Sequence, residues 1–290
     1  MQPYLEIVKK VLDTGFKKPT RTGTDAFTIA GGIFEHDMSL GYPLLTTKKV
    51  PFKLVATELE FFIKGSTDKQ WLIEHNNHIW DEWANPKKAP YGHDEESKKR
   101  MLEERDLGAI YGFQWRHYNA AYTNYDADYN GQGVDQLQKL VETLKKNPDD
   151  RRMIVNAWNP SMIDQMALPP CHYGYQATVI DGKLNVMWNQ RSVDVMLGLP
   201  FNIASYALLL HLLAKETGLK EGRLIGFLGD VHIYANHVEG AQEQLSRDPK
   251  KYPLPTLQTE NFTSIFDWKA EDTTVVGYES YPRISFEIAV

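Results

Sequence analysis

The chain of 290 residues contains one cysteine, Cys171, which follows two prolines and precedes a histidine in "LPPCH". A single cysteine most simply serves as a small buried hydrophobic residue. A cysteine–histidine pair is not expected, because Cys171 and His172 are adjacent in an expected strand, where successive side chains point to opposite faces. If Cys171 is a nucleophile, nearby cationic groups must favour its thiolate by lowering its pKa. Arginines are therefore the groups to find.

Arginines occur in three separate stretches, "TRTGT", "DDRRMI" and "NQRSVD". Taken singly, each is more simply a solvated charge or the partner of a surface carboxylate. The adjacent Arg151 and Arg152 are different, because they open an expected strand and alternation sends their guanidinium groups in different directions. A neighbouring subunit is one partner that would make use of both.

Composition restricts the classes of function. The net charge of −6 argues against broad binding to nucleic acid or anionic membranes, so no obligate nucleic-acid partner is expected. One cysteine permits neither an internal disulfide nor a cysteine-based zinc site, and no secretory or transit segment is visible, so a cytoplasmic protein is expected. The longest apolar stretch, at 197–218, is interrupted by Asn202, Ser205 and His211, which favours a buried helix over a membrane span.

Periodicity predicts the elements that must hold these residues. Helices are expected at 3–14, 55–65, 134–148 and 204–219, and strands at 153–158, 172–180, 183–193, 223–229 and 283–290. The strands follow one another without regular intervening helices, so we expect an α+β fold with a large mixed sheet flanked by helices. Residues 84–130 are polar, aromatic-rich and weakly periodic, which predicts a long surface excursion. Without linkers or repeats, the chain is expected to form a single domain over residues 1–290.

Nine stretches, in order along the chain, resemble the thymidylate synthase family. They are "RTGT" (21–24), "PLLTTKK" (43–49), "IWDEWA" (79–84), "YGFQWRH" (111–117), "NPDDRR" (147–152), "MALPPCH" (166–172), "QRSVDVMLGLPFNIASYALL" (190–209), "GDVHIYANH" (229–237) and the terminal "AV". The resemblance spans essentially the whole chain. It implies a mainly antiparallel sheet through which two copies of the chain dimerise.

The same resemblance implies the conversion of dUMP to dTMP by a homodimer, with 5,10-methylenetetrahydrofolate as the cofactor that leaves as dihydrofolate. Cys171 matches the nucleophile that adds to C6 of uracil and thereby activates C5. Glu58 matches the general acid/base that acts through water, and Tyr111 and His172 match its proton-handling partners. Asn202 matches the residue that reads the base edge, because its amide can donate to O4 and accept from N3–H.

Binding residues follow from the resemblance as well. For dUMP they are Arg21, Gln190, Arg191, Ser192, Asn202, His232 and Tyr234 from one subunit, with Arg151 and Arg152 from its partner. For the folate they are Lys48, Trp80, Trp83, Asp194, Leu197, Gly198, Phe201 and Ala289. Asp194 also counts as catalytic because it matches the carboxylate that binds the pterin ring, and Lys48 is expected at the glutamate tail. Residues 288–290 are expected to close over the folate as a lid, and no metal is implied.

Four places depart from the family pattern. Asp25 stands where glycine is usual, Glu60 and Phe61 where leucine and tryptophan are usual, Ala177 where an aromatic residue is usual, and Asn189 where tyrosine is common. Asn189 matters most, because it lies two residues before Arg191 and so shares its strand face. Smaller or polar groups of this kind could admit water.

Three functions therefore stay open. Nucleotide hydroxymethylases, relatives that trap the same methylene intermediate with water, look similar at "ELE" and at the asparagine before "QRS", so a dUMP hydroxymethylase is the alternative. Apolar walls exclude water from a reactive methylene, and here Trp80, Leu168 and His172 match the reducing enzymes. The third function is a non-catalytic nucleotide-binding or RNA-binding module. The residues that argue against it are Cys171, Glu58 and Asn202.

Overall fold

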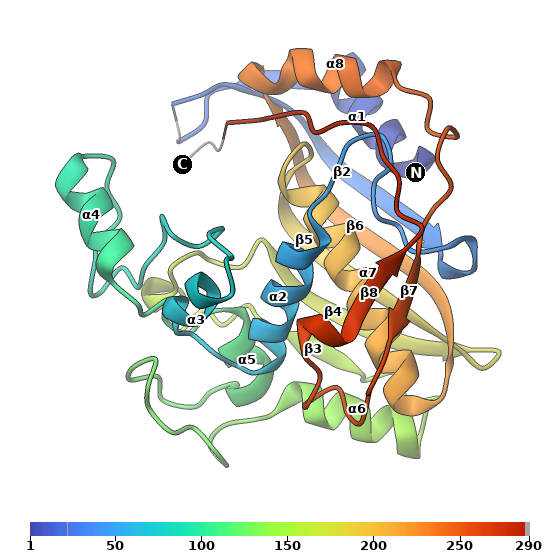
Figure 1. Ribbon diagram of the computed structural model, residues 1–290. Coiled ribbons are helices and arrows are strands. Elements are labelled where there is room, and N and C mark those ends of the chain that lie inside the picture. The colour runs from blue at the N-terminus through green and yellow to red at the C-terminus, as the bar shows by residue number, and fades with distance from the viewer. Residues whose placement is uncertain (22, 288–290) are drawn as a thin grey trace.

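Six strands form one sheet, in the order β1-β2-β6-β5-β4-β3 (Figure 1). The computed structural model describes residues 1–21 and 23–287. β5 and β6 run parallel, and the other neighbouring strands run antiparallel, so the mixed, mainly antiparallel sheet is confirmed. The six strands are β1 (Phe16–Lys18), β2 (Ala26–Asp37), β3 (Ile154–Asn156), β4 (His172–Ile180), β5 (Lys183–Asp194) and β6 (Lys220–Tyr234). A separate antiparallel pair consists of β7 (Thr256–Thr259) and β8 (Thr273–Val276).

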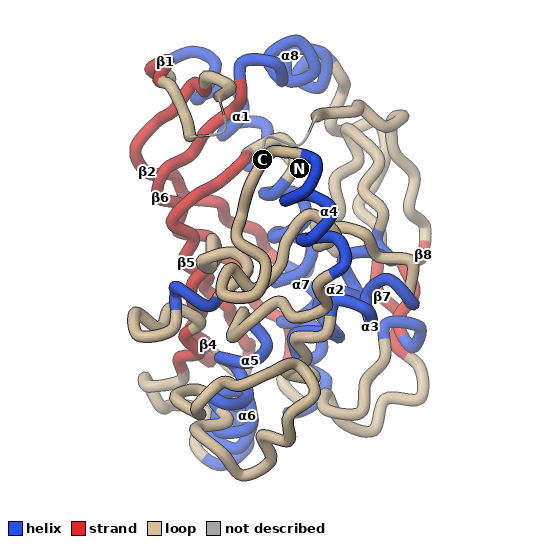
Figure 2. The backbone as a smooth tube through the Cα atoms, turned by 90° about the vertical axis from the view of Figure 1, so that its left-hand side faces the viewer, coloured by secondary structure: helices blue, strands red, loops and turns tan. Residues whose placement is uncertain are grey.

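Helices flank this sheet, which lies along one side of the molecule in Figure 2. α7 packs against β5 and β6, and α2 packs against both α5 and α7. The helices are α1 (Gln2–Thr14), α2 (Phe52–Ile63), α3 (Lys69–Glu74), α4 (Glu95–Glu103), α5 (Tyr111–His117), α6 (Gln136–Lys146), α7 (Gly198–Thr217) and α8 (Val238–Ser246).

α7 is the central helix of the core. Leucine and alanine side chains are buried around nearly its whole circumference, which is typical of a helix enclosed by other elements. It ends where Gly218 adopts a left-handed conformation with φ of 70°, which glycine tolerates without steric cost. Across the part of the chain that the structure describes, no helix is long and apolar enough to span a membrane.

Several predicted boundaries need correction. α7 begins at Gly198, six residues before the predicted start, because Pro200 is compatible with a first helical turn. The predicted strand 283–290 is wrong over 283–287, which is irregular, and its last three residues lie outside the described residues. β2 was not predicted. Gly31, with φ of 77°, interrupts its alternation where the pairing passes from Ala30–Asp230 to Gly32–Leu228.

One face of the six-stranded sheet carries exposed apolar side chains. Ile33 pairs with Phe227, and Phe227 pairs in turn with Asn189, so these three residues form a row across β2, β6 and β5. Ile33 is 63% exposed and Phe227 is 43% exposed. Paired residues project to the same face of a sheet, whereas the buried neighbours Trp188 and Gln190 project to the opposite face. Asn189 therefore belongs to this outer face.

The expected surface excursion at 84–130 is only partly on the surface. Within it, α5 is a core helix in which Tyr111, Phe113 and Trp115 are buried. Periodicity did not predict this helix, because α5 is only seven residues long and covers barely two helical turns.

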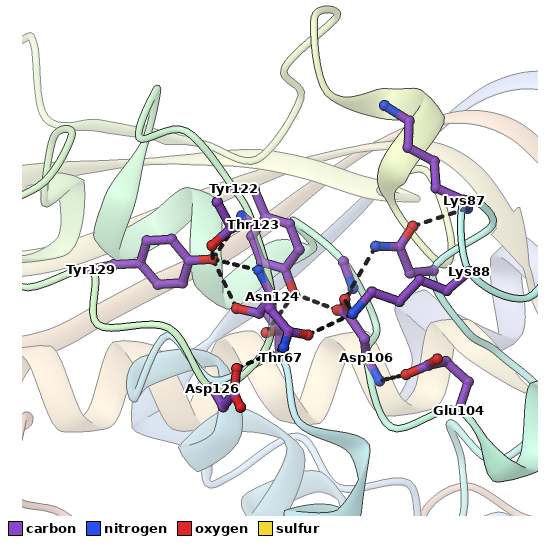
Figure 3. A network of polar contacts seen from close by, with 12 residues as sticks. Thr67, Lys87, Lys88, Glu104, Asp106, Tyr122, Thr123, Asn124, Asp126 and Tyr129 are labelled. Atoms are coloured by element: carbon purple, nitrogen blue, oxygen red, sulfur yellow. Dashed lines mark hydrogen bonds and ion pairs between the residues drawn. The ribbon is translucent and has the colours of Figure 1, made fainter.

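A buried carboxylate holds the excursion together (Figure 3). Asp106 is fully buried and accepts hydrogen bonds from the Gly108 amide at 2.7 Å and from Asn85 Nδ2 at 3.3 Å. Lys88 Nζ lies 2.6 Å from its Oδ2, and the Tyr122 hydroxyl donates to its Oδ1. A buried charge persists when it is paired and hydrogen-bonded, so this network fixes the backbone just before α5.

Candidate active site

Cys171 lies immediately before β4, at the end of the sheet where β4 meets β5. Its backbone N–H donates to the Tyr111 hydroxyl at 2.8 Å, and its carbonyl accepts from the Arg191 amide at 2.8 Å. Arg191 Nη2 lies 4.0 Å from Cys171 Sγ. The same guanidinium group donates to the carbonyls of Pro169 and Pro170, at 2.8 Å and 2.9 Å. The two prolines thus hold the arginine beside the thiol.

Burial and the nearby arginines act in opposite directions on the ionisation of this thiol. Burial raises the pKa of Cys171 above its ordinary value, and the positive charges of Arg191 and Arg21 only partly oppose this effect. The carboxylate of Asp194 acts in the same direction as burial. Arg191 and Arg21 act to lower the pKa of the thiol, as expected of neighbouring arginines, but desolvation is the larger effect.

His172 points into an aromatic enclosure. Its Nδ1 lies 2.9 Å from the Tyr206 hydroxyl, and its ring stacks on Tyr111 with centroids 4.4 Å apart. Burial lowers the pKa of His172 to about 3, so the imidazole is neutral at physiological pH. A neutral imidazole can relay a hydrogen bond but cannot act as a cationic acid.

Glu58 lies on α2 with its carboxylate inside the protein. Trp80 Nε1 donates to Glu58 Oε1 at 2.8 Å. Burial raises the pKa of Glu58 to about 7, although the hydrogen bond from Trp80 acts in the opposite direction. The simpler interpretation, an exposed helix carboxylate, is wrong. A carboxylic acid that titrates near neutral pH is suited to give and take protons during turnover.

Aromatic rings pack around Tyr111, next to these groups. Phe62 stacks on Tyr111 with centroids 4.9 Å apart, and Trp80 meets Tyr111 edge-on at 6.1 Å. Burial keeps the pKa of the Tyr111 hydroxyl well above its usual value, so this group remains a neutral hydrogen-bonding hydroxyl. Electrostatic interactions are stronger in such a low-dielectric enclosure than in water.

The side-chain amide of Asn202 has a fixed orientation. Gln190 Nε2 donates to Asn202 Oδ1 at 2.9 Å and to the Ser192 carbonyl at 3.1 Å. Trp188 Nε1 in turn donates to Gln190 Oε1 at 3.1 Å. This chain of bonds occupies the carbonyl oxygen of Asn202 and leaves its NH₂ group to donate to a ligand. Gln190 was expected to bind substrate directly, and its contact with Asn202 was not foreseen.

The structure brings two of the four candidate arginines to the thiol. Arg191 contacts it, and Arg21 is close enough to influence its pKa. Arg152 is exposed and pairs with Asp150, with Nε at 3.0 Å from Oδ1. The register of β3 on β4 pairs Ile154 with Gln176, so Arg151 and Arg152 lie toward the far end of β4. At about 3.3 Å per residue, that end is roughly 20 Å from Cys171.

The end of β6 contributes His232 and Tyr234, whose rings lie 5.2 Å apart as expected for residues on one strand face. His232 Nδ1 lies 3.0 Å from Asp230 Oδ1. His232 also pairs with Asp194 across β5 and β6. The two strands thus end together beside the start of α7.

Asp194, the last residue of β5, bonds to the backbone that leads into α7. Its Oδ1 accepts hydrogen bonds from the backbone amides of Met196 and Leu197, at 2.9 Å and 3.0 Å. These bonds hold the two residues that directly precede α7. The expected folate residues of the first turn of α7 follow directly: Leu197, Gly198 and Phe201.

The remaining folate candidates differ in their placement. Trp80 is buried, whereas Trp83 is half-buried and stacks on Tyr91 with centroids 5.7 Å apart. Lys48 was expected at the glutamate tail, but it is buried, and its ammonium group donates to the Met196 carbonyl. That burial lowers the pKa of Lys48 to about 8. Ala289 lies outside the described residues.

The departures from the family pattern do not converge on Cys171. Glu60 is buried and points away from Glu58, because its Oε2 accepts a hydrogen bond from the Ala270 amide at 2.8 Å. Ala177 is fully buried beside Val186, six residues along the chain from Cys171.

The other departures also have partners of their own. Asp25 forms an ion pair with Lys17 at 3.1 Å. Phe61 is buried and stacks on Trp71, and Asn189 lies on the outer sheet face described above.

The partly buried thiol beside an arginine and the carboxyl group with a raised pKa lie at one end of an α+β sheet, an arrangement typical of an enzyme active site. The sequence matches the family model described as thymidylate synthase over residues 2–290. Because this match covers essentially the whole chain, the protein belongs to the thymidylate synthase family. The family comprises transferases of nucleotide biosynthesis that act on dUMP with methylenetetrahydrofolate as cosubstrate.

Proposed function

We propose that this protein is a thymidylate synthase that converts dUMP to dTMP. 5,10-Methylenetetrahydrofolate supplies the one-carbon unit and the hydride, and leaves as dihydrofolate. The observation that carries the proposal is that Tyr111 lies between two groups: it accepts a hydrogen bond from the Cys171 amide at 2.8 Å, and Glu58, whose pKa burial raises to about 7, is close enough to act on it electrostatically. Arg191 Nη2 lies 4.0 Å from the Cys171 sulfur. In this proposal Cys171 is the nucleophile, Arg191 supplies a positive charge, and Glu58 is the general acid and base.

Cys171 starts the reaction by adding its sulfur to C6 of the uracil ring. The S–H proton leaves to solvent, the S–C6 bond forms, and the electron pair of the C5–C6 double bond moves toward O4. Burial raises the pKa of the thiol, so the thiolate that attacks C6 is a minor form of Cys171 before substrate binds. Arg191 stabilises the negative charge while it resides on sulfur.

Asn202 recognises the base, and Gln190 positions it. With its carbonyl oxygen engaged by Gln190, Asn202 directs its NH₂ group to the developing charge on O4. A donor at this place suits the O4 oxygen of uracil and is mismatched to the amino group of cytosine.

Proton transfer falls to the enclosed groups. Glu58 acts through water as general acid and base, and Tyr111 helps to remove the proton from C5. His172 takes part as a neutral imidazole, consistent with a pKa of about 3. When the S–C6 bond breaks at the end of turnover, its electron pair returns to sulfur and the thiol is restored.

The phosphate of dUMP is held by arginines from two subunits. Arg21, Arg191 and Ser192 come from one chain, and Arg151 and Arg152 from its partner, because the latter two lie roughly 20 Å from Cys171 of their own chain. The exposed apolar row of the outer sheet face supports a homodimer formed through the sheet, as do the exposed Ile154 and Ile180. His232 and Tyr234 bind the deoxyribose.

The chain's own residues also fit the folate. Trp80 and Trp83 form an aromatic wall, Asp194 offers a carboxylate to the pterin ring, and the first turn of α7 supplies Leu197, Gly198 and Phe201. Lys48 reaches the glutamate tail only if its ammonium leaves the Met196 carbonyl.

The continuous hydrophobic core, which extends from α1 to Trp268, supports a single domain.

We further infer that the methylene unit is reduced rather than hydrated, because the polar departure Glu60 is bonded to Ala270 and faces away from the site. One assay with dUMP and methylenetetrahydrofolate tests this. dTMP and the absorbance rise of dihydrofolate are expected. A product heavier by one oxygen, with no dihydrofolate, would identify a dUMP hydroxymethylase instead. Failure to release tritium from C5-labelled dUMP would identify a binding module.

A further inference from the structure

Lys69, the first residue of α3, has an unusual environment for a lysine. The residue is only 1% exposed. Its Nζ donates to three backbone carbonyls, those of Asp81 at 3.1 Å, Trp83 at 3.0 Å and Met101 at 2.6 Å. An ammonium group has three N–H donors and no acceptor, so all of its hydrogen-bonding capacity is used.

The three acceptors belong to two different segments. The carbonyls of Asp81 and Trp83 come from the loop that carries both tryptophans of the proposed folate wall, and that of Met101 comes from α4. Lysine is rarely buried unless its charge is compensated. Here three backbone carbonyls, whose oxygens carry partial negative charge, stabilise the positive charge of Lys69. The ammonium group thereby connects the two segments.

The tryptophan loop leads directly to the catalytic carboxyl group. Trp80, which precedes one anchored carbonyl, donates its Nε1–H to Glu58 Oε1 at 2.8 Å. The anchored Trp83 stacks on Tyr91, with the ring planes inclined by 14°. A shift of this loop therefore moves the aromatic wall and the hydrogen bond to Glu58 together.

We propose that Lys69 is a positioning residue for the cosubstrate: its ammonium group fixes the Trp80–Trp83 loop against α4, and through Trp80 it fixes the environment of Glu58. The inference rests on the proposed function, because it takes the tryptophans as the folate wall and Glu58 as the acid/base. Lys69 itself touches neither substrate. The backbone carbonyls that bind its ammonium group leave no pattern in the sequence.

Charged groups around Lys69 determine how the contact responds to pH. Burial lowers the pKa of Lys69 to about 8, while the carboxylates of Asp81 and Glu104 act in the opposite direction. Asp81 is itself paired with His78, at 2.9 Å, and the neighbouring Asp68 with Arg105. Above about pH 8 the neutral amine retains only two N–H donors, so at least one of the three carbonyls loses its partner.

The decisive experiment compares Lys69→Met with Lys99→Met, an exposed lysine on α4. Wild-type turnover of dUMP is measured first, because its absence would reject the proposed function rather than the role of Lys69. In Lys69→Met the KM for methylenetetrahydrofolate should rise roughly tenfold, as expected for lost hydrogen bonds to a charged group. The Kd for dUMP should stay within about twofold, because the phosphate site is not touched. Lys99→Met should match the wild type.

An unchanged folate KM in folded Lys69→Met would overturn the proposal. So would equal losses in folate and dUMP binding, because they would indicate general destabilisation. If the variant does not fold, the wild type between pH 7 and pH 9 provides the test. A lowered lysine pKa means that the folded state releases its proton first, so this group raises the free energy of unfolding as pH rises above 8. A folate KM that rises while stability does not fall supports positioning, and a flat folate KM rejects it.

Discussion

Gln190 Nε2 donates a hydrogen bond to Asn202 Oδ1 at 2.9 Å, and this bond decides which end of the Asn202 amide faces a bound base. On its other side, Gln190 Oε1 accepts a hydrogen bond from Trp188 Nε1, which holds the Gln190 side chain in place. Gln190 and Trp188 together therefore set the orientation of the Asn202 amide. If Asn202 recognises the base as proposed, base choice depends on the Trp188–Gln190–Asn202 chain of hydrogen bonds rather than on Asn202 alone.

Gln190→Glu should reverse this orientation. A carboxylate at position 190 can accept from Trp188, but it can only accept from Asn202, so the Asn202 amide turns and presents its oxygen to the base. The kcat/KM for dUMP should fall at least about tenfold and the relative use of dCMP should improve, as a mismatched polar group predicts. Asn202→Asp should act in the same direction. An unchanged dUMP-to-dCMP ratio in both variants would show that another residue reads the base.

Glu58 should produce a pH-dependent step near neutrality. The pKa of about 7 predicts a limb of the kcat/KM profile near pH 7, which Glu58→Gln should remove together with roughly 10²- to 10⁴-fold of activity. Because the hydrogen bond from Trp80 favours the carboxylate, Trp80→Phe should move the limb to higher pH. A limb that stays in place in Trp80→Phe would assign it to another group.

The same carboxyl group should affect stability with the opposite sign to a salt-bridged acid. Its folded-state pKa lies above the unfolded value, so the folded state binds the extra proton between about pH 4.5 and pH 7, and stability falls as pH rises through this window. Glu58→Gln should therefore be more stable than the wild type at pH 8, by on the order of 1–3 kcal/mol. Thermal or urea unfolding at pH 5 and pH 8 would reveal the difference, which should be much smaller at pH 5.

Subunit mixing should test the origin of the phosphate arginines. Cys171→Ser and the double variant Arg151→Ala/Arg152→Ala should each be nearly inactive alone. If the two arginines serve the partner's site, a mixed dimer contains one intact site, and an equal mixture should recover about a quarter of wild-type activity for random pairing. No recovery, with subunit exchange demonstrated by mass, would place all the arginines of a site in one chain.

Glu60→Leu should separate stability from reaction outcome. The substitution leaves the Ala270 amide without its acceptor, which should lower stability by roughly 1–3 kcal/mol. The product should nevertheless remain dTMP with dihydrofolate, because the carboxylate does not face Cys171. The exposed Glu95 offers a control, since Glu95→Leu should change neither property. A different product from Glu60→Leu would show that this position controls access of water.

Local patterns in the sequence predicted the elements that depend on nearest neighbours. The β4–β5 hairpin was predicted because Asp181 and Gly182 both favour the positive φ values of 52° and 68° found in its turn. The helix from Gln136 was predicted because Leu137, Leu140, Val141 and Leu144 lie on one buried face. β2 was missed because Gly31 breaks its alternation.

The site residues remain predictions from the family resemblance, and the structure adds their surroundings. The residues around Cys171 were expected from the family resemblance, and the structure brings Arg191, Glu58 and Tyr111 into one enclosure. The raised pKa of the thiol could not be predicted, because it depends on how much protein surrounds the sulfur in three dimensions. The role of Lys69 was equally hidden, since backbone carbonyls leave no trace in the residue types that flank it.

Because Cys171 is the single cysteine of the chain, ligand binding near it can be followed by chemical labelling. The 290 residues contain no second thiol, so a thiol-directed probe attaches at this one sulfur. The moles of label bound per mole of chain then give the fraction of intact sites, without any mutagenesis. Attachment should be slow at neutral pH, because the thiolate is the reactive form and burial disfavours it. A ligand that approaches Arg191 should change the rate of labelling before any product is formed. The speed at which this single sulfur reacts would thus register occupancy of the pocket by ligands that never turn over.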